Sequence, residues 1–325
     1  MSHFVARQAC PVCGETGFEA VYEAPYRGDP VRGFLDSHYA DQGFVDWSLF
    51  GDEAYEVVHC PRCDLLFQRL VPDDALLARI YTEMTQHERV AAIERAMVTR
   101  DSVDKVAGEF AHLFRLTGKP IADITVLDYG LGFGRWARVA RGLGATVYAT
   151  EIGEEKRQLA RSLGIEVIDD ADIDAMQFDI VHTEQVMEHL IEPGRDFARL
   201  ARATRHLLKA AVPARGRAGE LLRSRGLPAV SPYRRAAQGE RMGRDDDAFI
   251  SIQPLEHLNA YSATTMRWLG EHNGLALASR VRLGTVSVDM TSPKRLLGSL
   301  KQLGTMAAKA TLRPDRGYYL FRRAA

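Results

Sequence analysis

Near the middle of the chain lies the segment Val126-Leu127-Asp128-Tyr129-Gly130-Leu131-Gly132-Phe133-Gly134, in which three glycines alternate with larger residues. The apolar residues before Asp128 predict a strand, and residues 135–143 predict a helix. Glycines permit a tight turn and close approach of a ligand to the backbone, while a helix start offers free N–H groups. Asp128, at the end of the strand, can pair with a cationic amino group. The segment is therefore typical of a ligand-binding strand, turn and helix, although a turn without a ligand would use similar residues.

Short apolar strands alternate with helical stretches after this point. The predicted strands cover residues 125–127, 146–149, 166–168, 179–181 and 207–212. Farther along, the pattern predicts a helix at 264–273, a strand-like stretch at 276–290, a basic helix at 293–311 and a last strand at 318–322. Such alternation implies a mostly parallel sheet covered by helices on both faces. The sequence therefore predicts a doubly wound α/β fold.

The spacing of the glycines and acids narrows the kind of ligand. Dinucleotide sites read Gly-x-Gly-x-x-Gly, whereas this chain reads Gly-x-Gly-x-Gly, with Asp128 two residues before the first glycine. Glu151 follows the second strand, where an acidic residue can accept hydrogen bonds from ribose hydroxyls. This arrangement resembles the S-adenosylmethionine (SAM) motif of class I methyltransferases.

Further matches follow in the order that class I methyltransferases show. They are Asp169-Asp170-Ala171-Asp172 after the third strand, then Phe178-Asp179-Ile180-Val181, then the stretch from Glu184 to Met187-Glu188-His189-Leu190. The sequence of these segments resembles that of methyltransferases acting on small molecules and sugars. The resemblance implies a seven-stranded sheet and a SAM site that contains Asp128, Gly130, Gly132, Gly134, Glu151, Asp170 and Glu184.

All four cysteines of the chain fall in two Cys-x-x-Cys pairs, Cys10/Cys13 and Cys60/Cys63. No run of apolar residues reaches the roughly 20 residues that a membrane span requires, and the first residues lack the apolar core of a signal peptide. We therefore expect a cytoplasmic protein. A reducing cytosol favours thiolate ligands over disulfides, and four thiolates predict a closed, structural zinc site. Four buried cysteines without a ligand are the alternative.

The second cysteine pair also carries a family resemblance. Two segments resemble the zinc domain of the sugar C-methyltransferases of deoxysugar biosynthesis. They are Cys60-Pro61-Arg62-Cys63-Asp64-Leu65-Leu66-Phe67-Gln68 and Cys10-Pro11-Val12-Cys13-Gly14. We therefore expect a β-rich zinc module at 1–71, a helical linker or lid at 72–118 and the SAM-binding domain at 119–325. The resemblance is incomplete, because the chain is too short for the second α/β domain of that family, and oxygen is as good an acceptor atom as carbon.

The catalytic candidates lie after the predicted fifth strand, in Gln253-Pro254-Leu255-Glu256-His257-Leu258-Asn259-Ala260-Tyr261-Ser262. This stretch resembles one in the same sugar methyltransferases, where the Glu-His pair lies beside the substrate, and it implies that His257 and Glu256 remove a proton from the acceptor. His189 is the next candidate base. Histidine titrates nearest to neutral pH, which suits this role. In the alternative interpretation the stretch only starts a helix, with Ser262 as its N-cap.

The charge of the chain is balanced overall but not locally. Lys and Arg number 42 against 43 Asp and Glu, yet residues 195–244 hold 13 basic and 3 acidic residues. This excess, with the Arg-rich insertion at 214–250, predicts a small anionic acceptor such as a nucleotide-linked or phosphorylated sugar. A solvated or disordered loop is the alternative.

Two other functions compete with this interpretation. An RNA methyltransferase could grip nucleic acid through the cysteine module and the insertion, but the module itself is rich in acids, so nucleic acid is disfavoured. A non-catalytic scaffold that keeps the fold is the other alternative, and the intact glycines and acids of the turn argue against it.

Overall fold

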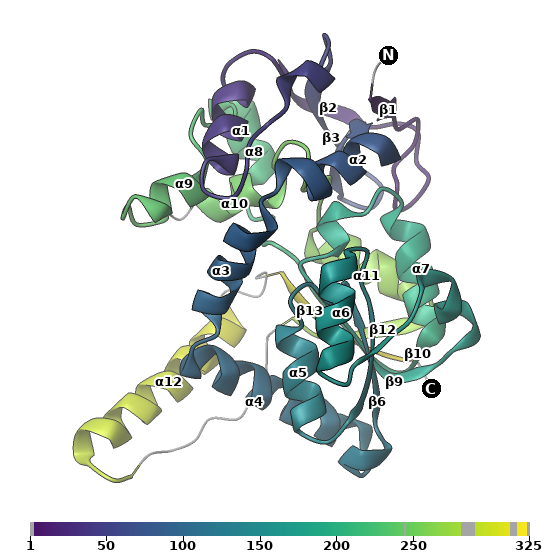
Figure 1. Cartoon of the computed structure of the whole chain (residues 1–325), viewed down its shortest axis with the longest axis vertical. Helices are drawn as coiled ribbons and strands as arrows, with labels where there is room; N and C mark the ends of the chain where they lie inside the picture. Colours follow the sequence, from purple (N-terminus) through teal and green to yellow (C-terminus); the bar gives the residue numbers. More distant parts are fainter. Residues whose placement is uncertain (1–2, 244, 281–289, 313–316, 324–325) are drawn as a thin grey trace. The chain divides into compact units, whose positions relative to one another are not determined.

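The structure is a computed structural model that describes residues 3–243, 245–280, 290–312 and 317–323. It consists of two compact units, each assembled from several segments of the chain (Figure 1). Unit 1 comprises Met1–Arg95, Met187–Asp196 and Val212–Leu269. Unit 2 comprises Ala96–Val186, Phe197–Ala211 and Gly270–Ala325.

Unit 2 is built on a sheet that has seven strands among the described residues, in the order β12-β13-β10-β9-β6-β7-β8. The strands are β6 (Thr125–Tyr129), β7 (Thr146–Thr150), β8 (Glu166–Val167), β9 (Phe178–Glu184), β10 (Thr204–Ala211), β12 (Leu275–Ser279) and β13 (Tyr318–Arg323). Strands β6 to β10 pair in parallel, and β13 pairs antiparallel with both of its neighbours. The predicted doubly wound, mostly parallel sheet of seven strands is confirmed.

Helices cover both faces of this sheet. On one face, Phe110 of α4 (Arg100–Thr117) and Trp136 of α5 (Arg135–Gly142) lie 5.4 and 5.1 Å, centroid to centroid, from the ring of His182 on β9. On the other face, Phe197 of α7 (Pro193–Ala203) meets Phe321 of β13 edge to face at 5.4 Å. The remaining elements of unit 2 are η3 (Ile121–Asp123), α6 (Glu154–Ser162), η4 (Asp170–Ala175) and α12 (Pro293–Leu312), together with the end of α11 (Ala263–His272), which begins in unit 1. The apolar core of unit 2 lies between the sheet and α4 and α5.

The predicted elements of the C-terminal part are present where the structure describes them. The helix predicted at 264–273 is α11, the basic helix is α12 and the last strand is β13. The strand-like stretch predicted at 276–290 begins as β12, but residues 281–289 lie outside the described residues.

Unit 1 holds two small antiparallel sheets. One pairs β1 (Phe4–Ala6) with β5 (Leu70–Pro72), and the other has the order β11-β4-β3-β2. Its strands are β2 (Glu19–Pro25), β3 (Ala54–His59), β4 (Leu66–Gln68) and β11 (Asn259–Ala260). Strand β11 comes from the segment that contains the predicted catalytic pair, so distant parts of the chain share one sheet. The β-rich character predicted for the N-terminal module is confirmed.

Helices complete unit 1. In chain order they are α1 (Val31–Tyr39), η1 (Trp47–Leu49), α2 (Asp74–Arg79), η2 (Ile80–Met84), α3 (His87–Met97, whose end passes into unit 2), η5 (Met187–His189), α8 (Ala218–Arg225), α9 (Pro232–Ala237) and α10 (Asp246–Ser251). The helical character predicted for residues 72–118 is present as α2, η2, α3 and α4.

The Arg-rich insertion is folded as α8, α9 and α10. Leu221 and Leu222 of α8 and Phe249 of α10 are buried in the same apolar core as Tyr26 and Phe34 of the N-terminal module. A fully buried leucine or phenylalanine contributes about 1.5–3 kcal/mol to folding, so these contacts hold the insertion in place. The alternative of a disordered loop is therefore wrong for its described part, residues 214–243 and 245–250.

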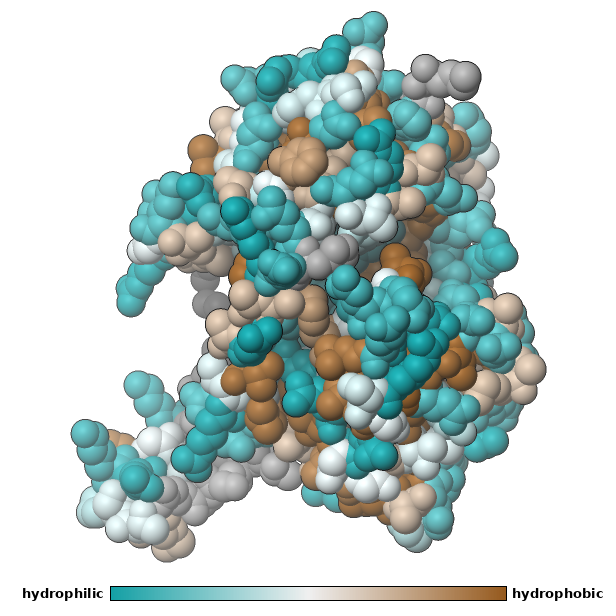
Figure 2. Space-filling view, viewed as in Figure 1, coloured by the Kyte–Doolittle hydropathy of each residue, from teal (hydrophilic) through white to brown (hydrophobic). Residues whose placement is uncertain are grey.

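The face of the molecule drawn in Figure 2 is mostly hydrophilic, with some apolar residues. Figure 2 shows apolar side chains on this face over α4 and α5, whereas polar side chains cover much of the N-terminal module. Among the described residues, no helix has both the length and the apolar character that a membrane span requires.

Candidate active site

The glycine turn after β6 has the backbone geometry that the sequence predicts. Gly130, Gly132 and Gly134 have φ angles of +78°, +57° and +72°, in the left-handed region that residues with a Cβ atom rarely adopt. A Cβ atom on Gly130 would lie 2.4 Å from a methyl carbon of Val186, so glycine is also required by packing. A Cβ atom on Gly132 would meet nothing within 4 Å, so there is open space beside the turn.

Asp128 lies on β6 just before this turn, and it is 3% exposed. Its Oδ1 accepts a hydrogen bond from Nδ1 of His182 at 2.7 Å. The other oxygen, Oδ2, is buried and accepts no well-formed hydrogen bond within the part of the chain that the structure describes. Burial raises the pKa of Asp128 to about 8, although the charge of Lys209 opposes this effect. The backbone N–H of Ala137 also lies near this carboxyl and lowers its pKa, and a buried carboxylate at this position fits the amino group of a ligand such as SAM.

Glu151 ties the end of β7 to the glycine turn. Its Oε2 accepts a hydrogen bond from the backbone N–H of Gly132 at 2.9 Å, and its Oε1 accepts one from Gly153 at 2.9 Å. The side chain is 6% exposed. The structure therefore places Glu151 beside the turn, and its contact with a ribose stays a prediction.

The two remaining predicted cofactor residues also lie at or after the ends of parallel strands. Asp170 lies at the start of η4. Its Oδ2 is 2.6 Å from Nη2 of Arg199 and 3.4 Å from the hydroxyl oxygen of Tyr129. Glu184, the last residue of β9, forms an ion pair with Lys209 of β10. The predicted acids thus lie along the carboxyl edge of the parallel strands, which is where α/β sheets bind ligands.

Sequence reasoning missed two residues beside this edge, His182 and Lys209. Lys209 is fully buried, and its Nζ lies 3.0 Å from Nε2 of His182 and 4.7 Å from the ring centroid of Trp136. A lysine inside the apolar strand Leu207-Leu208-Lys209-Ala210-Ala211 is a signal that could have found it, because lysine is almost never fully buried without a partner.

The four cysteines form a compact cluster in unit 1. Their Sγ atoms lie 3.5 Å apart in the pairs Cys10–Cys63 and Cys13–Cys60, and all four are free thiols. Zn–S bonds of about 2.3 Å in a tetrahedron require sulfur atoms about 3.8 Å apart, so the donor set and spacing fit a zinc ion.

The backbone repeats the same turn at both cysteine pairs. In the first, the N–H of Cys10 donates to Glu15 and the N–H of Gly14 donates to Cys10. In the second, the N–H of Cys60 donates to Leu65 and that of Asp64 donates to Cys60. Two equivalent turns around one sulfur cluster indicate that the module is shaped for a shared ligand.

The predicted catalytic residues also lie together in unit 1. The backbone N–H of Leu258 donates to the carbonyl of Glu188 at 2.7 Å, which joins the segment of His257 to η5. The rings of His189 and His257 meet edge to face with centroids 4.7 Å apart. His257 is 7% exposed, and its Nδ1 bonds to the carbonyl of Ile250. Because a carbonyl only accepts, Nδ1 carries the proton and Nε2 of His257 has a free lone pair.

Burial controls the charges of this cluster. It lowers the pKa of His257 to about 3, and the neighbouring His189 lowers it further. Burial also lowers the pKa of His189, against the opposing effect of Glu256. For Glu256 burial opposes ionisation, but His38 and the hydroxyl of Tyr39 outweigh it and lower the pKa to about 2. Both imidazoles are therefore neutral at physiological pH, while Glu256 is ionised.

Tyr81 is a third residue that sequence reasoning missed, and it lies at this cluster of histidines. Its hydroxyl lies 3.4 Å from Nδ1 of His189. Ser262 caps α11, because its Oγ accepts the N–H of Thr265 at 3.1 Å, so this part of the helix-start interpretation is confirmed. That cap does not involve His257 or Glu256, whose catalytic role stays a prediction.

Most arginines of residues 195–244 form ion pairs. The pairs are Arg215–Asp64, Arg217–Glu220, Arg223–Glu19, Arg225–Asp245, Arg234–Asp41 and Arg235–Asp246 in unit 1, and Arg199–Asp170 and Arg202–Asp174 in unit 2. Many of the acidic partners are distant in sequence. The local excess of positive charge is therefore compensated in the fold, which weakens its use as evidence for an anionic acceptor.

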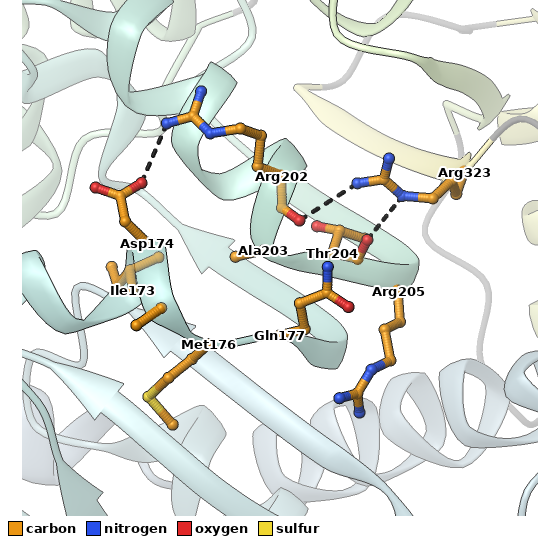
Figure 3. Close-up of a pocket in the computed structure, with 10 residues that line it drawn as sticks. Ile173, Asp174, Met176, Gln177, Arg202, Ala203, Thr204, Arg205 and Arg323 are labelled. Atoms are coloured by element: carbon orange, nitrogen blue, oxygen red, sulfur yellow. Dashed lines mark hydrogen bonds and ion pairs between the residues drawn. The ribbon is translucent and has the colours of Figure 1, made fainter.

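A pocket of about 740 Å³ opens at the opposite edge of the sheet, beside the amino ends of β9 and β10 (Figure 3). Arg202 pairs with Asp174 there, and Arg323 donates to the carbonyls of Arg202 and Thr204. Because these two guanidinium groups are already bound and the predicted cofactor residues lie at the other edge, we do not assign the cofactor or acceptor to this pocket.

Comparisons with known proteins found a matching family model and similar solved structures. A family model described as a methyltransferase domain matches residues 103–280, more than half of the 325-residue chain. The solved structures similar to this chain include the plantazolicin methyltransferase BpumL in complex with SAH, at 12% identity and TM-score 0.45, covering 76% of this chain and 94% of that one. Magnesium protoporphyrin IX methyltransferase from Synechocystis PCC 6803 is 14% identical with TM-score 0.40, covering 78% and 100%. No curated protein matches the chain.

Proposed function

Because this chain belongs to the methyltransferase domain family, we propose that it transfers the methyl group of SAM to a small-molecule acceptor. The observation that carries the proposal is the carboxyl edge of the sheet, where a glycine turn and four acids lie at or just after the ends of parallel strands.

The residues that would hold SAM are those of the turn and the acids. Asp128 would accept the amino group, since its Oδ2 is buried without a well-formed hydrogen bond among the described residues. Gly132 leaves space beside the turn, and Glu151 would contact the ribose hydroxyls. Asp170 and Glu184 complete the proposed set. When bound, SAM supplies an electrophilic methyl group, so the chain needs only to orient the acceptor and remove a proton.

His257 is the first candidate to accept that proton, and Glu256 would support His257 in this role. The hydrogen bond to Ile250 holds the imidazole in the tautomer whose Nε2 can accept a proton. Glu256, held by Tyr39 and His38, keeps a negative charge near the imidazoles that would favour the protonated state. His189 is the second candidate, because it is in contact with His257 and its side chain is 25% exposed.

We further propose a nucleotide-linked or phosphorylated sugar as the acceptor class to test first. The support is the resemblance of the cysteine module and of the Glu256-His257 stretch to sugar methyltransferases. The ion-paired arginines give this class no added support, so it must be tested against neutral analogues. Oxygen and carbon both remain candidate acceptor atoms.

The proposal also includes a zinc ion with a structural role. Cys10, Cys13, Cys60 and Cys63 would use all four positions of a tetrahedral ion and leave none for a substrate. The ion would hold together two turns that are 46 residues apart in the sequence.

The deciding experiment uses the full chain with methyl-labelled SAM and a matched panel of acceptors. The panel contains nucleotide-linked sugars, sugar phosphates, the same sugars without phosphate, and a structured RNA. Label transfer to a sugar nucleotide or sugar phosphate supports the proposed acceptor. Transfer to RNA alone would overturn it in favour of the nucleic-acid alternative, and SAM binding without transfer to any member would reject this acceptor class.

A further inference from the structure

A row of three ionisable side chains crosses the sheet of unit 2 beside the proposed SAM site. Asp128 of β6 pairs in register with His182 of β9, and His182 pairs in register with Lys209 of β10. Side chains in register on neighbouring parallel strands point to the same face of a sheet. The three side chains are therefore aligned by the backbone pairing itself.

Hydrogen bonds link the members of this row. Nδ1 of His182 lies 2.7 Å from Oδ1 of Asp128, and Nζ of Lys209 lies 3.0 Å from Nε2 of His182. Lysine ammonium has donors only, so it must donate to Nε2. Nε2 is then an acceptor, and the proton of a neutral His182 must lie on Nδ1, where it is donated to Asp128.

The surroundings hold the side chain of Lys209 in place. Glu184 forms an ion pair with its ammonium, and a carboxylate oxygen of Glu109 lies 3.6 Å from it. Its Nζ also lies over the ring of Trp136, at 4.7 Å from the centroid. Asp128, His182, Lys209 and Glu109 are each at most 3% exposed, so water does not compete for these contacts.

We propose that His182 and Lys209 are positioning residues for the cofactor: Lys209 fixes the tautomer of His182, and His182 orients Asp128 as a carboxylate toward a cationic amino group. This inference rests on the proposed binding of SAM by Asp128. The carboxyl groups of Glu184 and Glu109 lie beside the single ammonium of Lys209, and that of Asp128 is linked to it through His182. This balance of charges favours a ligand that brings positive charge.

Calorimetric titration of SAM into the wild-type chain and into His182→Phe tests the proposal. Phenylalanine keeps a ring against Phe110 and Trp136 but removes both nitrogens. Losing a hydrogen bond to a charged group should weaken SAM binding at least about tenfold. His182→Gln, which keeps one donor and one acceptor, should recover most of that loss.

His112→Phe is the matched control, because His112 belongs to α4 of the same unit and lies outside the row. It should leave SAM affinity within twofold of the wild type. If His182→Phe also binds within twofold, the positioning role is overturned. If the wild type itself does not bind SAM, the proposed function fails instead.

Nitrogen-15 NMR of the wild-type chain gives a second readout that does not depend on SAM or on the folding of a variant. The spectrum of His182→Phe identifies the signal of His182 by its absence, and specific labelling does so if that variant does not fold. A neutral ring protonated at Nδ1 supports the row. A ring protonated at Nε2, or an imidazolium at neutral pH, would overturn it.

Discussion

The imidazole rings of His189 and His257 meet edge to face in unit 1, with their centroids 4.7 Å apart. His189 is held by Tyr81 on one side, and His257 by the carbonyl of Ile250 on the other. Two neutral imidazoles in contact can share the task of accepting one proton, so variants must separate their roles.

His257→Ala should reduce turnover by about 100-fold to 10,000-fold, which is the usual effect of losing a general base. SAM affinity should stay near wild type, because the proposed SAM residues belong to unit 2, and the chain should stay folded although loss of the buried ring lowers its melting temperature. Steady-state kinetics, calorimetry and thermal melting measure the three quantities. His189→Ala should cost less if His257 is the base.

His3→Ala provides the control for this pair, since His3 is a histidine of unit 1 outside the cluster. Its turnover should be unchanged. Turnover of His257→Ala within a few-fold of wild type, or a loss explained by unfolding, would move the assignment to His189.

Gly132→Ala should weaken SAM binding strongly while the chain stays folded. The φ angle of +57° strains any residue with a Cβ atom, and the added methyl would enter the space proposed for the ligand. Gly118→Ala is a matched control, because Gly118 ends α4 with φ +71° and its Cβ would also meet nothing within 4 Å. Both variants should lose similar stability, and only Gly132→Ala should lose SAM affinity. Equal SAM affinities would refute the assignment of the turn.

Local patterns in the sequence predicted the strands of unit 2, the glycine turn and the cysteine pairs. Each of these depends on neighbouring residues, such as an apolar run before Asp128 or the spacing of Cys10 and Cys13. The positive φ angles at the glycines follow from the need for a tight turn between β6 and α5. Such features can be predicted because their causes are local.

The partners of the site residues could not be predicted in the same way. His182 is 54 residues from Asp128, Tyr81 is 108 from His189, and Asp41 is 193 from Arg234. These contacts are set by strand register and by packing of the insertion on the N-terminal module. A local count of charge therefore overestimated the positive potential of residues 195–244, since the compensating acids come from elsewhere in the chain.

SAM affinity should rise with pH between about 5.5 and 7.5, below the range near 7.7–8.0 where an amino group itself titrates. Asp128, with a pKa of about 8, is mostly protonated in the free protein at these pH values. Binding an ammonium requires the carboxylate, so affinity should rise up to about tenfold per pH unit. The groups that face Asp128 are His182, Lys209, Glu184 and Glu151.

Calorimetry in buffers of different ionisation enthalpy should detect the released proton directly. Asp128→Asn should bind SAM weakly and with a flat pH profile. A rising profile that persists in Asp128→Asn would show that another group controls the binding.

The same substitution should stabilise the free protein at pH 7. An unfolded chain releases the proton of Asp128 near pH 3.9, whereas the folded chain holds it up to about pH 8. As pH rises from about 4 to about 8, Asp128 therefore lowers the free energy of unfolding. Asparagine carries no charge but still offers an oxygen to His182, so Asp128→Asn should melt a few degrees higher at pH 7 and show no such gain near pH 4. An equal change at both pH values would contradict the burial of an ionisable carboxyl.

Cys60→Ser should lower the zinc content from about one ion per chain and destabilise unit 1. Loss of one thiolate opens the tetrahedron and weakens the link between the two turns, and metal binding to such a site contributes directly to folding. Elemental analysis gives the metal content, and thermal melting before and after chelation gives its effect on stability. The proposed SAM residues lie in unit 2, so the substitution should change the stability of unit 1 more than it changes SAM affinity, each measured against the wild type.

Val12→Ala is the control, because Val12 is a buried residue of the first turn that offers no ligand atom. This variant should lose some stability but no zinc. Full metal content in Cys60→Ser, or a wild-type chain without zinc, would leave the cluster as four thiols without a ligand and refute the structural ion.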